Sequence, residues 1–145
     1  MEIKIKRLRP EAKLPTRGSA FAAGYDLYAD LDADVMIKPH TTEKISAGIA
    51  LEIPEGYFGG IYARSGLATK ENLRPANCVG VIDADYRGLV TVALHNDSDE
   101  IRTVLPGERI AQLVIQPFLS VSFAETDVLS ETVRGEGGFG STGKA

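Results

Sequence analysis

Apolar and polar residues alternate with a period of two along several stretches of the chain. The longest such stretch has its apolar positions at Ile45, Ala47, Ile49, Leu51 and Ile53. Shorter stretches with the same alternation lie at 3–6 and 90–95. Because successive side chains of a strand point to opposite faces of a sheet, this pattern predicts half-buried strands.

Turn-forming residues separate these stretches at a spacing typical of short strands. Pro54-Glu55-Gly56 fits a reverse turn with proline at its second position and glycine at its fourth. Pro106-Gly107 fits a type II turn, because glycine accepts a positive φ at the third position. The Asn-Asp-Ser-Asp stretch at 96–99 predicts a hairpin loop.

Only residues 65–72 favour a short helix. The 145 residues include 15 glycines and 7 prolines, which are too many for a helical bundle. The length suits one domain with a sizeable core. We therefore predict an all-β, single-domain distorted barrel or jelly roll over residues 1–133. Residues 134–145 are predicted to form a flexible glycine-rich arm.

Composition and charge narrow the classes of function. The net charge of −4 argues against a non-specific binder of nucleic acid or membranes, which would be basic. No apolar run approaches the roughly 18 residues that a membrane helix needs, and no signal peptide is visible. The single cysteine, Cys78, allows no internal disulfide and favours a reducing compartment. We expect a cytoplasmic or other intracellular protein with no nucleic-acid or membrane partner.

Four segments interrupt the alternation with glycine, charged and hydroxyl residues. They are AGYDLYA at 23–29, ARSGLA at 63–68, GVIDADYRG at 80–88 and GERIAQL at 107–113. Each lies where a strand is predicted to start or end, which is the usual place for functional residues on a β scaffold.

Arg64-Ser65-Gly66 opens the one predicted helix. An arginine fork, a hydroxyl group and a glycine that permits close approach suit a phosphate. A helix-capping serine beside an incidental arginine is the alternative interpretation.

Three polar residues in the other segments have a functional and a structural interpretation. Asp83 ends an apolar strand and is either a general base at the rim of a cleft or a turn residue. Gln112 either contacts a ligand or is a satisfied structural amide. Asp26 either supports a metal or makes a hydrogen bond in a turn or at a strand end. With only two histidines in the chain and no Cys/His cluster, zinc is not expected, and any metal would be Mg²⁺ held mainly by phosphates and water.

The last twelve residues, RGEGGFGSTGKA, contain five glycines. The stretch Gly138–Lys144 matches most of a phosphate-binding P-loop, but Ala145 replaces the required serine or threonine. Glycines without an apolar face cannot pack by themselves. One arginine, one aromatic ring and two hydroxyl groups nevertheless describe a segment that orders over an anionic, planar ligand.

These five segments resemble, in order, the five motifs of the trimeric dUTPase family. AGYDLYA resembles the first motif, ARSGLA the second, GVIDADYRG the third, GERIAQL with Pro117 the fourth, and RGEGGFGSTG the fifth. The resemblance covers nearly the whole chain, and none of its functional motif positions departs from the family pattern.

The resemblance implies a β-rich homotrimer with three active sites at subunit interfaces. The arm of one subunit would close over a site built by the other two. The reaction would be hydrolysis of dUTP to dUMP and pyrophosphate, with Mg²⁺ on the triphosphate. Such an enzyme keeps uracil out of DNA and supplies dUMP for dTTP synthesis.

The resemblance also implies a role for each motif residue. Asp83 would deprotonate the water that attacks the α-phosphorus and would bind the 3′-hydroxyl of the sugar. Asp26 would support the Mg²⁺ shell through water, and Tyr86 would lie against the deoxyribose. Phe139 would stack on the uracil. The uracil would be read by the hairpin residues Asn77, Gly80, Val81, Ile82 and Asp83. The phosphates would be held by Arg64, Ser65, Gly66, Gln112, Arg134, Gly140, Ser141 and Thr142.

Two other functions fit the same fold. A dCTP deaminase would need an acid–base residue, typically glutamate, beside the pyrimidine, and GVIDADYRG offers aspartate instead. A nucleotide-binding regulatory protein would bind dUTP without hydrolysing it.

Overall fold

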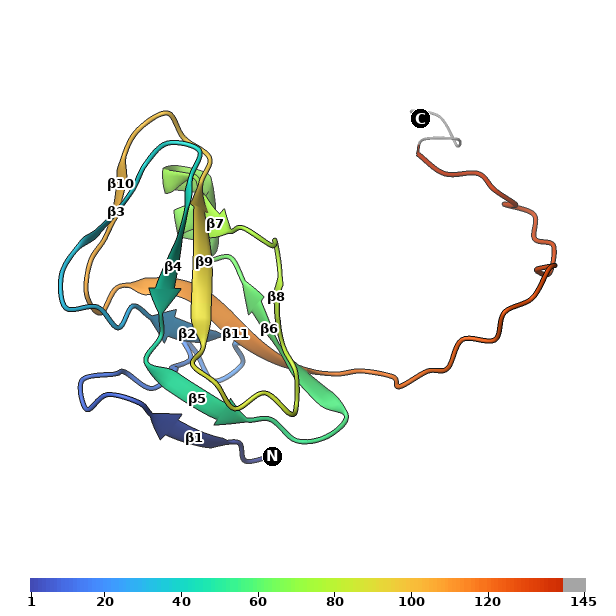
Figure 1. The fold of residues 1–145 in the computed structure, drawn as a ribbon, viewed down its shortest axis with the longest axis horizontal. Coiled ribbons are helices and arrows are strands. Elements are labelled where there is room, and N and C mark those ends of the chain that lie inside the picture. The colour runs from blue at the N-terminus through green and yellow to red at the C-terminus, as the bar shows by residue number, and fades with distance from the viewer. Residues whose placement is uncertain (140–145) are drawn as a thin grey trace.

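The computed structural model describes residues 1–139, which form eleven strands and one short helix (Figure 1). The elements are β1 (Lys4–Arg7), β2 (Tyr25–Tyr28), β3 (Val35–Ile37), β4 (Thr42–Ser46), β5 (Ile49–Glu52), β6 (Tyr57–Tyr62), η1 (Leu67–Glu71), β7 (Leu73–Pro75), β8 (Gly80–Ile82), β9 (Thr91–Asn96), β10 (Arg102–Val104) and β11 (Arg109–Pro117).

The strands pair into small antiparallel sheets rather than one large one. The largest sheet has the order β2-β11-β6-β8, and a second has the order β4-β9-β7. Two further pairs are β1-β5 and β10-β3. The predicted all-β, single-domain fold class is confirmed.

The period-two pattern correctly identifies the core positions of β9. Val92, Leu94 and Asn96 are fully or almost fully buried, while the residues between them are only half-buried. Val92 and Leu94 pack with buried isoleucines, leucines and valines of the other strands into one core cluster. Each such side chain contributes about 1.5–3 kcal/mol by leaving water.

The alternation across 45–53 does not reveal that the chain bends at Gly48. The structure divides this stretch into β4 and β5, which belong to different sheets. Gly48 has φ of +67°, and a Cβ there would lie 2.6 Å from the Asp30 carboxyl group and 2.7 Å from the Ala12 methyl group. Only glycine fits this bend, because both its conformation and its surroundings exclude a side chain.

One of the predicted turns is confirmed and another is displaced. Gly107 has φ of +75° and is the third residue of a turn closed by a 3.1 Å hydrogen bond across 105–108. In the turn at 54–57, the amide of Tyr57 donates to the carbonyl of Pro54 at 3.2 Å. Glycine therefore stands at the third position of that turn, not the predicted fourth.

The predicted hairpin at 96–99 is wrong, because β9 pairs with β4 and β7 whereas β10 pairs with β3. Asn96 explains the difference. Its side chain is fully buried, and its amide nitrogen donates to the carbonyls of Ile37 at 3.0 Å and Glu100 at 2.7 Å. Its oxygen accepts from the amide of Ser98 at 2.9 Å. The residue that indicates a turn in sequence therefore ties β9 to the end of β3.

The predicted helix at 65–72 forms as a single wide turn. η1 has the π-helical pattern, and Asn72 ends it in the left-handed conformation with φ of +56°. Gly66 precedes η1 without a side-chain capping bond. Ser65 is therefore not a capping serine, which removes the structural interpretation of that residue. No helix in the described part of the chain is long or apolar enough to cross a bilayer.

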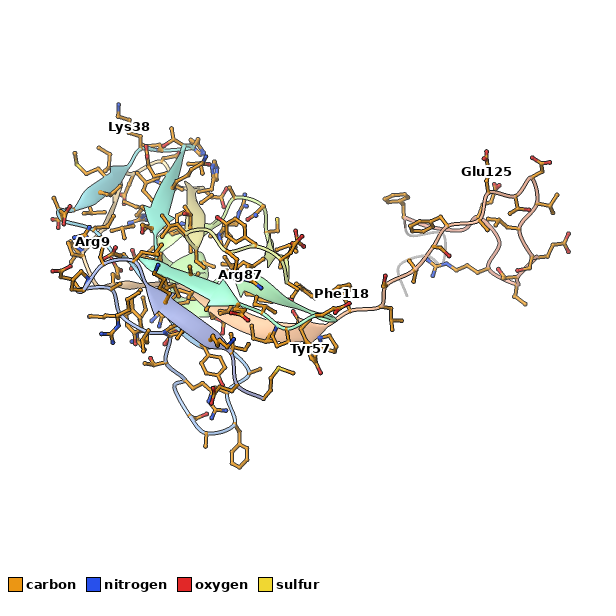
Figure 2. The ribbon with its side chains drawn as sticks, turned by 60° about the horizontal axis from the view of Figure 1, so that its bottom comes forward. Arg9, Lys38, Tyr57, Arg87, Phe118 and Glu125 are labelled. Carbon is orange, nitrogen blue, oxygen red and sulfur yellow. The ribbon has the colours of Figure 1, made fainter. Side chains whose placement is uncertain are left out.

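After β11 the chain runs away from the sheets (Figure 1). It leaves beside β6, where the amide of Phe118 donates to the carbonyl of Gly56 at 3.0 Å and Pro117 pairs with Tyr57. Figure 2 shows Tyr57 and Phe118 together at this exit. The predicted boundary between residues 133 and 134 stays a prediction.

Replacing Asn96 by alanine should lower the free energy of unfolding by about 2–4 kcal/mol, because buried carbonyls lose their partner and a cavity forms. Urea denaturation measures this change. Thr103→Ala, at an exposed position of β10, is the matched control and should change stability by less than about 0.5 kcal/mol. Equal stability of the two variants would contradict the role given to Asn96.

Candidate active site

Strand pairing brings residues of three predicted motifs together. Within the largest sheet, Gln112 of β11 pairs with Asp26 of β2 on one side and with Tyr62 of β6 on the other. Arg64 follows β6 directly. Residues far apart in sequence therefore meet at one end of this sheet.

The carboxylate of Asp26 binds two arginines. Its Oδ1 accepts from Arg64 Nε at 3.1 Å, and its Oδ2 accepts from Arg109 Nη1 at 3.2 Å. Arg64 Nη1 also donates to the carbonyl of Arg109 at 3.1 Å. We call Asp26, Arg64 and Arg109 the arginine cluster. Sequence reasoning missed Arg109, because its place in GERIAQL does not show which way its side chain points.

The arginine cluster leaves cationic N–H groups available to an anion. Asp26 is 17% exposed and Arg64 is 28% exposed, so their ion pair is partly desolvated. Arg64 Nη2 has no hydrogen-bond partner among residues 1–139. With Nε and Nη1 fixed, the guanidinium plane is held while its free edge can donate to a phosphate oxygen.

Gln112 lies beside the arginine cluster and is held by the backbone. Its Nε2 donates to the carbonyl of Ala63 at 2.8 Å. Gly24 lies against the same side chain, since a Cβ at Gly24 would overlap the Gln112 amide and lie 3.2 Å from its Cβ. The glycine before Tyr25 therefore provides the space that Gln112 occupies, a role that the sequence alone did not indicate.

Ser65 and Gly66 present an open surface at the start of η1. Both residues are exposed, and no atom lies within 4 Å of a Cβ built at Gly66. The carbonyl of Ser65 accepts from Thr69 Oγ1 at 2.7 Å. This bond fixes the backbone next to Arg64 while the Ser65 hydroxyl points to no partner in the described chain.

The predicted third-motif residues line a cavity of about 240 Å³. We call it the loop cavity, because the loop between β8 and β9 forms part of its wall. All six predicted residues are present, namely Asn77, Gly80, Val81, Ile82, Asp83 and Tyr86. The sequence did not indicate four further lining residues, Ile61, Leu89, Val90 and Thr91. Of these, Val90 and Thr91 belong to the alternating stretch at 90–95, which predicts only a half-buried strand.

Asp83 stands at the rim of the loop cavity, directly after β8. Its backbone carbonyl accepts from the amide of Tyr86 at 3.1 Å, which closes the turn. Its side chain is exposed and makes no hydrogen bond within residues 1–139. The alternative interpretation, a side chain that caps its own turn, therefore has no support, because the carboxylate has no partner within residues 1–139.

Asp83 and the arginine cluster lie at opposite ends of the β6-β8 pair. The register joins Gly59 to Ile82 and Ile61 to Gly80, so Asp83 follows β8 at the Phe58 end of β6. The strand from Phe58 to Tyr62 measures about 13 Å at roughly 3.3 Å per residue, and Arg64 lies beyond its far end. One chain therefore does not bring Asp83 and Arg64 into one site.

The arm carries the remaining predicted residues away from both groups. Arg134 Nε donates to the carbonyl of Gly137 at 2.8 Å, which closes a local turn. Phe139 is fully exposed, with φ of +47°. The predicted phosphate contacts Gly140, Ser141 and Thr142 lie outside the described residues.

Replacing Asp26 by asparagine should lower the free energy of unfolding by about 1–2 kcal/mol, because two arginines lose their charged acceptor. Urea denaturation measures this change at neutral pH. Asp34→Asn removes an exposed carboxylate elsewhere and should leave stability nearly unchanged. If Asp26→Asn were as stable as wild type, the carboxylate would not hold the arginines as described.

Known proteins match the chain over almost its full length. The dUTPase family model matches residues 10–143. The deoxyuridine 5'-triphosphate nucleotidohydrolase of Syntrophotalea carbinolica is 48% identical over 97% of this chain and 96% of its own. The protein of the same name from a Hydrogenobaculum species is 47% identical over 99% of both chains.

Solved structures agree with these relatives. A dUTPase of Staphylococcus bacteriophage 80alpha, in a structure with dUpNHpp, is 30% identical with a TM-score of 0.86 over 99% of both chains. A phage phi11 dUTPase, whose structure addresses the coordination of a structural Mg(II) ion, is 27% identical with a TM-score of 0.77. It matches 88% of this chain and 98% of its own. The chain therefore belongs to the dUTPase family.

Proposed function

We propose that the protein hydrolyses dUTP to dUMP and pyrophosphate, with Asp83 as the general base. The observation that carries this proposal is the Asp83 carboxylate, which is unpaired within residues 1–139 and lies at the rim of a cavity lined by all six predicted third-motif residues. The full-length match to deoxyuridine 5'-triphosphate nucleotidohydrolases supports the choice of substrate.

In the proposed reaction, Asp83 takes a proton from a water molecule as that water attacks the α-phosphorus. The bond from the α-phosphorus to the oxygen that bridges it to the β-phosphorus breaks, and pyrophosphate leaves with that oxygen. A positioned general base contributes roughly 10²–10⁴-fold in rate. Arg64 donates to the phosphates and offsets the charge that develops on the leaving group.

The arginine cluster fits Mg²⁺ only as an ion that the substrate brings. In residues 1–139, no three metal-ligating side chains come together. Both carboxylate oxygens of Asp26 already accept from arginines, so contact through water is the arrangement that suits it. When bound to the triphosphate, Mg²⁺ would neutralise phosphate charge.

The loop cavity suits a nucleoside. Its lining includes the short strand β8, and hydrogen bonds from the hairpin at 77–83, partly from its backbone, would read the polar edge of uracil. Those hydrogen bonds would reject cytosine, whose exocyclic amine donates where the O4 of uracil accepts. Tyr86, on the opposite loop, would lie against the sugar and leave no room for a 2′-hydroxyl group.

We further propose that the active site is completed between copies in a homotrimer. One chain holds Asp83 and the arginine cluster at opposite ends of β6, so a triphosphate that contacts both needs a second copy. The arm supports the same conclusion, since Leu119, Val121 and Phe123 alternate with serines and are all exposed. Such a segment is typical of a strand that pairs with another subunit.

The sheet region has a surface that suits the Leu119–Phe123 segment. β1 pairs only with β5 among the described residues, and an apolar groove of about 540 Å³ runs beside it. The groove is lined mainly by apolar residues, including Ile3, Ile5, Leu51 and Ile115. The Leu119–Phe123 segment of a neighbouring copy would bury its apolar side chains there.

Pyrophosphate release from dUTP, dCTP, dTTP and UTP with Mg²⁺ tests the activity directly. We expect strong preference for dUTP, and equal turnover of all four would contradict the proposal. Ammonia release from dCTP would indicate a deaminase, and tight dUTP binding without turnover would indicate a regulatory protein.

Replacing Asp83 by asparagine should lower kcat for dUTP by about 10²–10⁴-fold while nucleotide binding is retained, because the amide cannot accept the proton of water. Steady-state kinetics and equilibrium binding measure the two effects. Asp85→Asn is the matched control, because Asp85 is exposed and does not line the loop cavity. An unchanged rate for Asp83→Asn would exclude Asp83 as the base.

Deleting residues 134–145 should leave a folded trimer with turnover at least about 100-fold lower. The uracil would lose the Phe139 ring that stacks on it, and the phosphates would lose Arg134. Sedimentation velocity and dUTP hydrolysis measure assembly and turnover on the same preparation. Deleting only residues 143–145 is the control and should preserve activity. Full activity without the arm would show that it has no catalytic role, and a monomeric full-length protein would contradict the shared site.

A further inference from the structure

Tyr86 and Gly88 lie two residues apart in the loop between β8 and β9. Tyr86 lines the loop cavity together with Leu89, whereas Gly88 does not line it. The phenol ring folds back against Gly88. The size of the side chain at position 88 therefore determines where the Tyr86 ring lies.

Gly88 is needed for space rather than for backbone conformation. Its φ is not in the left-handed region, so an L-residue could adopt its conformation. A Cβ at Gly88, however, would lie 2.5 Å from the phenol oxygen, 2.6 Å from Cζ and 2.9 Å from Cε2 of Tyr86. All three atoms belong to the Tyr86 side chain, so with an added Cβ the phenol ring would have to move.

The backbone of the loop offers little freedom to relieve that overlap. The amide of Tyr86 donates to the carbonyl of Asp83 at 3.1 Å, and its phenol donates to the carbonyl of Leu89 at 2.9 Å. Arg87, labelled in Figure 2, folds back so that its Nη1 donates to the carbonyls of Ala84 at 2.6 Å and Tyr86 at 3.1 Å. A side chain at position 88 would therefore displace the ring and break its bond to Leu89.

We propose that Gly88 is a specificity-determining residue that acts through Tyr86. Because position 88 has no side chain, the Tyr86 ring can fold over Gly88 and form the wall that selects deoxyribose over ribose. This inference rests on the proposed function, because Tyr86 is the wall that faces the sugar. Gly88 itself touches no substrate and acts through the position of the ring. The Asp83 carboxylate does not depend on this contact.

Displacing the ring should affect dUTP and UTP differently. The deoxyribose of dUTP loses its contact with a fixed wall, while UTP never fits against that wall. A misfit the size of one methyl group changes discrimination by about tenfold or more. The ratio of kcat/KM for dUTP to kcat/KM for UTP should therefore fall, because dUTP loses a contact while the 2′-hydroxyl group of UTP gains the room that the ring had denied it.

The test compares Gly88→Ala with wild type in full-length protein, using both nucleotides with Mg²⁺. We expect the dUTP-to-UTP ratio to fall by about tenfold or more, with kcat for dUTP nearly unchanged. Gly18→Ala is the matched control, because no atom lies within 4 Å of a Cβ at Gly18. An unchanged ratio in Gly88→Ala would overturn the inference and leave dUTP hydrolysis standing. A wild-type protein without preference for dUTP would instead overturn the proposed function.

A coupled pair of variants separates steric control of Tyr86 from a general effect on the loop. In the Tyr86→Ala background no ring is present, so adding Gly88→Ala should not lower the ratio further. An equal fall in both backgrounds would show that Gly88 acts by another route. If Gly88→Ala folds poorly, Tyr86→Phe/Gly88→Ala carries the measurement, because it lacks the phenol oxygen nearest the added methyl group. Its ratio must then lie below that of Tyr86→Phe alone.

Discussion

The double pairing of β11 is the constraint on which the rest of the structure depends. This strand of nine residues bonds to β2 on one side and to β6 on the other. Its register sets Gln112 opposite Asp26 and brings Arg64 and Arg109 to one carboxylate. A slip of one residue would turn every side chain of β11 to the other face and take this cluster apart.

The same sheet explains why Asp83 lies apart from the arginine cluster. β8 pairs with β6 at the edge away from β2, and its short register leaves Asp83 at the far end of β6 from Arg64. The proposed general base and the arginines proposed to stabilise the leaving group therefore lie in separate parts of one chain. Symmetric association of identical chains would bring Asp83 and the arginine cluster together, because every interface would place the same two surfaces of neighbouring copies in contact.

The sequence predicts features that depend on local pattern and not those that depend on contact. Alternation identified β9, and the five ordered motifs identified the family. The bend at Gly48 and the position of Asn96 were not predicted, because each depends on contacts with residues distant in sequence. The roles of Arg109 and Gly88 were not predicted for the same reason. Nothing in the local sequence shows that Arg109 binds the Asp26 carboxylate or that Gly88 lies against the Tyr86 ring.

Mixing two inactive variants tests most directly the claim that the active site is shared. Asp83→Asn and Arg64→Gln subunits would each form inactive trimers, but a site between them can pair an intact Asp83 with an intact Arg64. Random one-to-one mixing by co-refolding should give such a pair in about a quarter of the sites. We therefore predict that dUTP hydrolysis recovers to about that fraction of the wild-type rate. A mixture as inactive as its two parents would show that each chain builds its site alone.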